Sequence, residues 1–135
     1  MKNKLVALSL LALSIVFVQC KKDDDENPST APSVNIVSPT VGKTFMSMDT
    51  LALEVIFTDP KELHNYSVEI TNVSLDSVIY TNSGHEHGTE LIVQDSIKLM
   101  VSDHSDMLLK ATVTNHLDEI TKDSVSFHVH PMGGH

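Results

Sequence analysis

The chain has 135 residues, with 18 Asp and Glu against 9 Lys and Arg, and a formal net charge of −9 at pH 7. This length fits one domain with additional segments. The clustered basic side chains that nucleic acids require are missing from such an acidic chain, so we expect no nucleic-acid partner. The same charge opposes peripheral binding to anionic lipid, and we attribute it mainly to solubility.

The first residues have the layout of an export signal. Residues 1–4 form a short basic segment, residues 5–18 carry no charge, and Cys20 follows this apolar run after a single glutamine. An apolar run of about 14 residues fits a signal peptide and falls short of the roughly 20 residues of a membrane-spanning helix. Because the run ends at a cysteine, we predict a lipoprotein signal peptide over residues 1–19 and acylation, including palmitate, at Cys20.

The residues behind the cysteine are charged. Lys21 and Lys22 come first, and the acidic run 23–26 follows. This order resembles the start of surface lipoproteins of the Bacteroidota, where an acidic stretch behind the lipidated cysteine looks like a signal for the outer face of the outer membrane. The resemblance implies a lipid-anchored outer-membrane protein that is exposed at the cell surface, with the membrane as a partner through its anchor.

Cys20 is the only cysteine of the chain. Once acylated, it is unavailable for an internal disulfide, which small envelope domains often use. It is equally unavailable as a thiolate ligand. The domain must therefore be held together by burial, and any metal site must depend on histidine and carboxylate side chains.

Strand signals begin after a polar stretch. Residues 20–32 are expected to form the lipidated cysteine and an acidic flexible tether, since they contain two prolines and almost no apolar side chains. From residue 33 onward, short segments of alternating apolar and polar residues are separated by turn signals, a pattern typical of β-strands. The expected strands are residues 33–38, 50–58, 64–72, 77–81, 90–101, 107–115 and 120–130.

Seven short strands in about 100 residues predict an all-β domain, an immunoglobulin-like antiparallel β-sandwich over residues 33–131, with a flexible end at 132–135. The pattern resembles the immunoglobulin-like domains of Bacteroidota surface lipoproteins, some of them uncharacterised and histidine-rich. The resemblance depends on a first strand that ends at Ser38-Pro39, a second that ends at Asp59-Pro60, and a final hairpin.

The eight histidines are the main candidates for function, because several occur in pairs one residue apart. Such pairs can reach a single ion, and imidazole suits zinc and copper. We expect Gly84 and Gly88 to let the loop that carries the first pair fold tightly. Alternate connections of an immunoglobulin-like sandwich meet at one end, which predicts two sites at opposite ends. The first expected site contains His64, His85, His87, His116 and Glu86, and the second contains His128, His130 and His104.

The sequence is compatible with two functions. The domain either binds a transition metal ion, zinc or copper, or serves as an interaction module for an envelope protein or a glycan, such as an accessory subunit of an outer-membrane complex. Met132 lies close to His130 in sequence and favours copper, since thioethers bind cuprous copper. The sequence has no phosphate-binding glycine loop, no nucleophile elbow and no free cysteine, so we expect no enzymatic activity.

Overall fold

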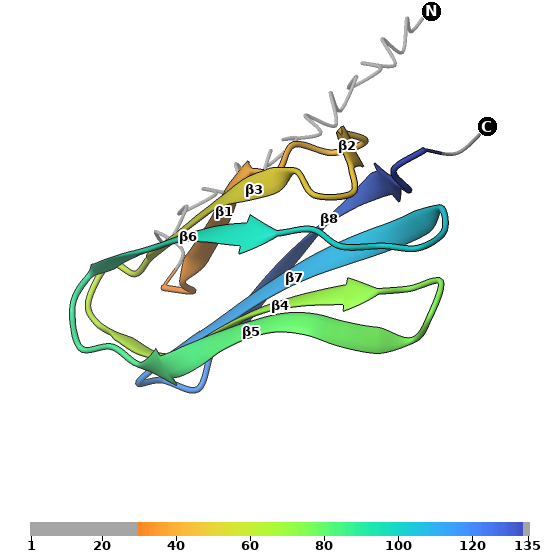
Figure 1. The fold of residues 1–135 in the computed structure, drawn as a ribbon. Helices are drawn as coiled ribbons and strands as arrows, with labels where there is room; N and C mark the ends of the chain where they lie inside the picture. The colour runs from red at the N-terminus through yellow and green to blue at the C-terminus, as the bar shows by residue number, and fades with distance from the viewer. Residues whose placement is uncertain (1–29, 134–135) are drawn as a thin grey trace, which may run out of the picture.

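A computed structural model describes residues 30–133, so the predicted signal peptide, Cys20, the tether as far as residue 29 and the last two residues lie outside the described residues. The described part forms eight strands in two sheets that pack face to face (Figure 1). This arrangement confirms the predicted all-β, immunoglobulin-like sandwich. Between residues 30 and 133 no helix is both long and apolar enough to cross a membrane. The strands are β1 (Ser33–Ser38), β2 (Thr44–Met46), β3 (Thr50–Thr58), β4 (Leu63–Asn72), β5 (Ser77–His85), β6 (Glu90–Lys98), β7 (Ser105–Asn115) and β8 (Ile120–His130).

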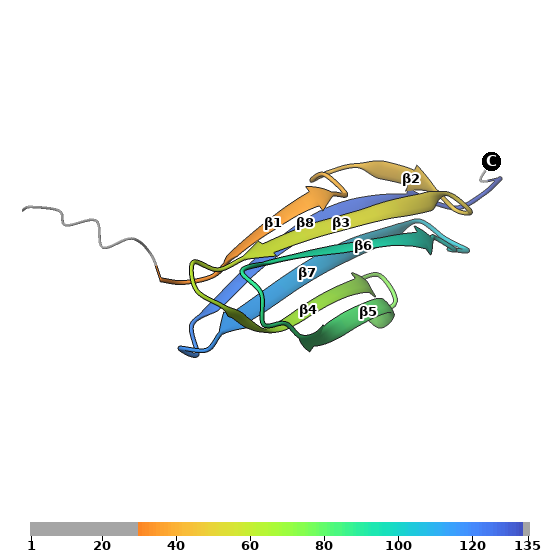
Figure 2. The ribbon, with the colours of Figure 1, turned by 90° about the vertical axis from the view of Figure 1, so that its left-hand side faces the viewer.

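The two sheets differ in size. The smaller sheet has the order β1-β3-β6, and the larger has the order β2-β8-β7-β4-β5 (Figure 2). All neighbouring strands are antiparallel except β2, which runs parallel to β8. β5 hydrogen-bonds to β4 and therefore belongs to the larger sheet.

Most strand bounds agree with the alternation of the sequence. β1, β3 and β8 have the predicted bounds, whereas β5 continues to His85 instead of ending at residue 81 and β6 ends at Lys98 instead of residue 101. The short strand β2 was not predicted, because its three residues present only one inward side chain, Phe45, and give no period of two.

The core lies between the sheets and is built by the inward side chains of the alternating segments. In β3, for example, every second side chain from Leu51 to Phe57 is almost completely buried. Phe45 and Phe127 meet edge to face at a centroid distance of 5.5 Å, which attaches β2 to the core next to β8. The buried apolar side chains are Phe45, Leu51, Leu53, Val55, Phe57, Leu63, Val68, Ile70, Val93, Leu99, Met107, Leu109, Ala111, Val113, Phe127 and Val129.

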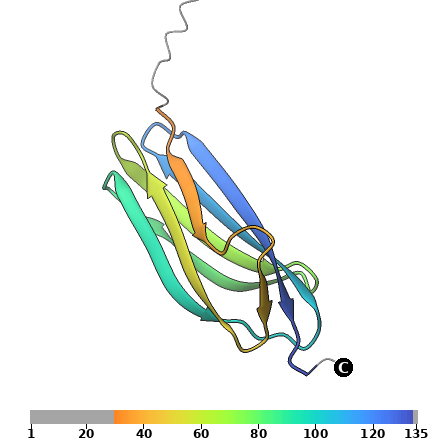
Figure 3. The ribbon, with the colours of Figure 1, turned by 90° about the horizontal axis from the view of Figure 1, so that it is seen from above.

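The two ends of the sandwich carry different connections. The β3–β4, β5–β6 and β7–β8 connections lie at one end, and β2 lies beside the last residues of β8 at the other end (Figure 3). The predicted division of the histidines between two ends is therefore the division that the structure has.

Candidate metal centres

The β7–β8 hairpin gathers histidines on the outer face of the larger sheet. Its register pairs Ser105 with Val129 and Asp106 with His128. Because Ser105 and Val129 are buried, the alternation turns Asp106, His128 and His130 outward. His104 directly precedes β7, so it is placed across from His130 on the same face.

His104, His128 and His130, which we term the triple-histidine cluster, each offer one ring nitrogen, and the three nitrogens lie within 4.8 Å of one another. His104 Nδ1 is 3.3 Å from His128 Nε2 and 2.9 Å from His130 Nδ1. Nitrogens at about 2.0 Å from a tetrahedral ion are spaced by roughly 3.3 Å. The separations therefore suit three ligands of one ion.

Asp106 orients one ring of this cluster. Its Oδ1 lies 2.7 Å from His128 Nδ1, which we assign as the donor of a hydrogen bond to the carboxylate. That tautomer leaves the lone pair of His128 Nε2 free and directed at His104. A carboxylate that fixes the second nitrogen of a metal-binding histidine is a frequent feature of metal sites, and it raises the basicity of the ligand.

Replacing Asp106 with Ala tests this orienting role. We expect metal affinity at the triple-histidine cluster to fall about tenfold, since outer-sphere partners of this kind contribute 10- to 100-fold and this carboxylate is largely exposed. Isothermal titration of Zn²⁺ measures the change. Asp123→Ala, which removes another exposed carboxylate from β8, is the matched control and should leave the affinity unaltered. Equal affinities for the Asp106 variant and the wild type would remove Asp106 from the site.

A second group of ligands, Glu62, His87 and His116, lies at the other end of the sandwich; we term it the Glu62 cluster. Glu62 Oε1 is 3.0 Å from His87 Nδ1 and 3.5 Å from His116 Nε2. The three residues come from the β3–β4, β5–β6 and β7–β8 connections. Their side chains are 44%, 70% and 42% exposed, which makes this cluster more open to water than the first.

A buried carboxylate holds the connections that carry the Glu62 cluster. Asp59 is only 4% exposed, and its Oδ1 accepts hydrogen bonds of 2.8 Å from the backbone nitrogens of both Lys61 and Glu62. Its Oδ2 accepts a bond of 3.1 Å from Asn115 Nδ2, next to His116. Asn115 Oδ1 in turn accepts bonds from the backbone nitrogens of Leu117 and Glu119. The network fixes the backbone on either side of the cluster.

Burial on its own raises the pKa of the Asp59 carboxyl, but the hydrogen bonds from Lys61, Glu62 and Asn115 outweigh that effect and hold the pKa below its ordinary value of 3.8. Asp59 is therefore an anion in the folded protein at neutral pH. Since the bonds favour the charged form, they contribute most to stability when this carboxylate is ionised.

The remaining residues of the first predicted site surround the Glu62 cluster and belong to neither set of convergent ligands among residues 30–133. The His64 ring stacks on His116 at a centroid distance of 4.4 Å, and His85 Nδ1 lies 3.2 Å from the backbone oxygen of His64. Glu86 does not face the cluster: its Oε1 accepts hydrogen bonds from the backbone nitrogens of His87 and Gly88. Glu86 therefore shapes the loop, and the carboxylate ligand of this cluster is Glu62 instead of the predicted Glu86.

Gly84, which we expected to let the loop of the first histidine pair fold tightly, has a different role. Gly84 lies within β5, opposite Tyr66 of β4, rather than in a loop. A Cβ added at Gly84 would lie 3.1 Å from the Tyr66 hydroxyl oxygen and 3.2 Å from its ring, so the glycine gives room to that side chain.

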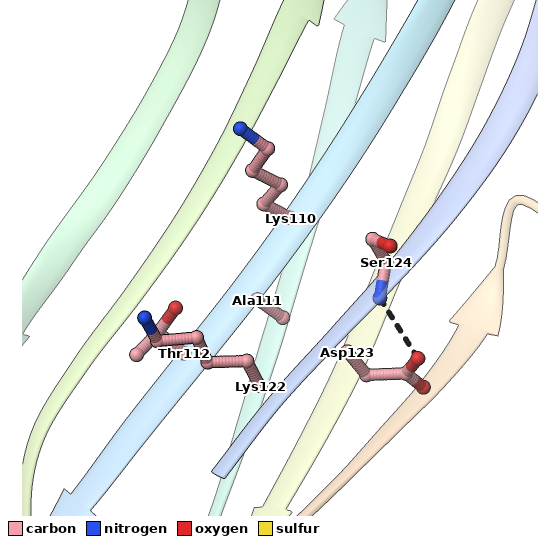
Figure 4. A pocket seen from close by; sticks show the side chains of 6 residues that line it. All are labelled: Lys110, Ala111, Thr112, Lys122, Asp123 and Ser124. Carbon is pink, nitrogen blue, oxygen red and sulfur yellow. Dashed lines mark hydrogen bonds between the residues drawn. The ribbon is translucent and has the colours of Figure 1, made fainter. Parts of the chain in front are cut away.

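A hollow lies elsewhere on the larger sheet, between β7 and β8 (Figure 4). In Figure 4 the Lys110 side chain extends from β7 toward β4 and the Lys122 side chain crosses β7, and Asp123 accepts a hydrogen bond from the backbone nitrogen of Ser124. Its lining contains two ammonium groups and no histidine. The hollow shares no residue with either cluster.

Sequence reasoning found all three histidines of the triple-histidine cluster and missed two carboxylates. Asp106 is recognisable only from the β7–β8 register, which brings it opposite His128. Glu62 stands two residues before His64, and that spacing is the one local signal that could have included it.

No protein-family model matches the sequence, and no curated protein matches it either. Solved structures with a similar fold include CopC from Methylosinus trichosporium OB3b, at 16% identity, 76% of this chain, 99% of that chain and a TM-score of 0.48. The fibronectin(III)-like modules of Clostridium thermocellum CbhA match at 14% identity and a TM-score of 0.46, over 79% of this chain and 52% of that chain. The superoxide reductase (neelaredoxin) of Ignicoccus hospitalis matches at 7% identity and a TM-score of 0.46, over 74% of this chain and 80% of that chain. Likenesses at this level are too distant to carry an argument about function.

Proposed function

We propose that this chain is a lipid-anchored envelope protein whose sandwich domain binds a transition metal ion at the triple-histidine cluster. The observation that carries the proposal is the convergence of three imidazole nitrogens, with spacings of 2.9 and 3.3 Å about His104. Neutral imidazoles are ligands for zinc and copper, whereas Ca²⁺ and Mg²⁺ require oxygen ligands. The ligand set therefore supports zinc or copper.

The two clusters differ in how firmly their ligands are held and in how exposed these ligands are. At the triple-histidine cluster the ligands lie on or directly beside paired strands, and Asp106 fixes one ring. At the Glu62 cluster the ligands lie in connections and are more exposed. We propose that the former is the principal site and that the Glu62 cluster binds a second ion more weakly.

The proposed role is capture or buffering of the ion, without catalysis. An acidic protein attracts cations in general, and the imidazoles would supply selectivity. Cys20 and the acidic run behind it, which lie outside the described residues, support attachment to the outer membrane and exposure at the cell surface. A lipid anchor would keep the domain where external metal ions arrive.

The interaction module remains the second hypothesis. The surface that would suit it is the β4–β5 hairpin, where several apolar side chains are more than half exposed. These are Val73, Leu75 and Val78. A partner protein bound there would also lie close to the triple-histidine cluster, because Val73 lines one surface hollow together with Asp106 and His128.

Titration of Zn²⁺ and Cu²⁺ into the purified full chain, kept in detergent, tests the proposed function. We expect one tight and one weaker binding event by calorimetry. Acidification should weaken both, because imidazole binds metal only in its neutral form. If neither ion binds more tightly than about 10 μM, the proposal is wrong.

A further inference from the structure

Met46 lies beside the triple-histidine cluster. β2 pairs in parallel with β8 so that Met46 is the partner of His130. Its neighbour Phe45 is buried in the core, so Met46 faces outward, as His130 does. Met46, His104 and His130 line one hollow on the surface, together with Pro131 and Gly133.

The backbone of Met46 is fixed relative to His130. The next residue, Ser47, donates a backbone hydrogen bond of 2.7 Å to the oxygen of His130. The Met46 nitrogen donates to Asp49 Oδ2 at 2.8 Å, and the Asp49 nitrogen donates back to the Met46 oxygen at 3.0 Å. This closed turn keeps the residue at the rim of the hollow. Its unbranched, flexible side chain lines the same hollow as two of the three histidines.

The triple-histidine cluster supplies three nitrogens and leaves one position of a tetrahedral ion open. A thioether is a soft, uncharged ligand that suits cuprous copper and contributes little to zinc. We propose that the Met46 sulfur is the fourth ligand and that the site consequently selects Cu(I) over Zn²⁺. This inference rests on the proposed function, because it assigns the ion of the same site.

Met46→Leu tests the assignment, since it removes the sulfur while conserving volume at a residue that is 46% exposed. The His87→Ala background disables the Glu62 cluster, so that one site is measured. Cu(I) affinity is determined without oxygen by competition with a chromophoric chelator, and Zn²⁺ affinity by calorimetry, on the full chain in detergent. We expect Cu(I) affinity to fall on the order of tenfold and Zn²⁺ affinity to stay within about twofold.

X-ray absorption at the copper edge identifies the sulfur directly. We expect one sulfur ligand in the parent protein, its loss in Met46→Leu, and its retention in two controls, Met132→Leu and Met100→Leu. Met132 and Met100 are also exposed methionines, at 65% and 71%. Copper bound with no sulfur, or a sulfur lost only in Met132→Leu, overturns the assignment and leaves the proposed function intact. An equal fall in Cu(I) and Zn²⁺ affinity also overturns it, because that result makes Met46 structural. A parent protein that binds neither ion ends both proposals.

Discussion

Replacing His104 with Ala should abolish tight metal binding at the triple-histidine cluster. His104 Nδ1 lies 3.3 Å from His128 Nε2 and 2.9 Å from His130 Nδ1. Removing it leaves only two of the three imidazole ligands, His128 and His130. We expect the affinity to fall on the order of 100-fold or more, which exceeds the effect of an outer-sphere residue. Calorimetric titration of Zn²⁺ in the His87→Ala background measures it.

The fold should not respond to the His104 change. His104 is exposed, and surface substitutions usually alter the free energy of unfolding by less than about 0.5 kcal/mol. His85→Ala, introduced into the same background, is the matched control, because it removes an exposed imidazole at the opposite end and should leave the tight site unchanged. Equal losses in both variants would mean that binding is a property of many surface histidines, and the account of a defined site would fail.

Replacing Asp59 with Ala should destabilise the whole domain. The variant leaves the backbone nitrogens of Lys61 and Glu62 without their acceptor and removes one of the three acceptors of the Asn115 amide. Hydrogen bonds to a charged group contribute about 1.5–3 kcal/mol, and unpaired buried donors add a cost. We expect a free energy of unfolding lower by about 2–3 kcal/mol at pH 7, measured by urea denaturation. The Glu62 cluster should also lose affinity, since its backbone support is gone, whereas the triple-histidine cluster should keep its own.

The stability gap between wild type and Asp59→Ala should depend on pH in one direction. Hydrogen bonds outweigh burial and hold the pKa of Asp59 below 3.8 in the folded protein. The stabilisation is therefore complete above that unfolded value and is lost as pH falls through the lower, folded value. Asp123→Ala, an exposed control, should change stability by less than about 0.5 kcal/mol. A gap that persists undiminished in acid would show that the Asp59 charge has no part in the effect.

The sequence was sufficient for most strands because a two-sheet core imposes a period of two. The segment 50–58 shows this clearly, since each inward residue from Leu51 to Phe57 is apolar and buried. β2 was not predicted because Phe45 is its only inward side chain, and a single apolar residue shows no alternation. β5 was predicted too short because Gly84 resembles a turn residue, whereas in the structure it accommodates the Tyr66 ring.

The candidate sites could be predicted at the level of sandwich ends and no finer. Chain topology placed His104 with His128 and His130, because alternate connections meet at one end. Which atoms converge depends on strand register and on local turns. The register of β7 and β8 brings Asp106 to His128, and the loop folded around the Glu86 carboxylate directs that side chain at its own backbone. Neither the register nor the orientation of Glu86 produces a periodic pattern in the sequence.

Anomalous X-ray diffraction from crystals of the zinc-loaded protein would locate the ion that we propose is held by three imidazoles at the end of β8. We expect an anomalous peak at the zinc edge about 2.0 Å from one ring nitrogen each of His104, His128 and His130, with Asp106 still hydrogen-bonded to His128. Strong zinc peaks elsewhere on the molecule, with none among these three rings, would contradict it.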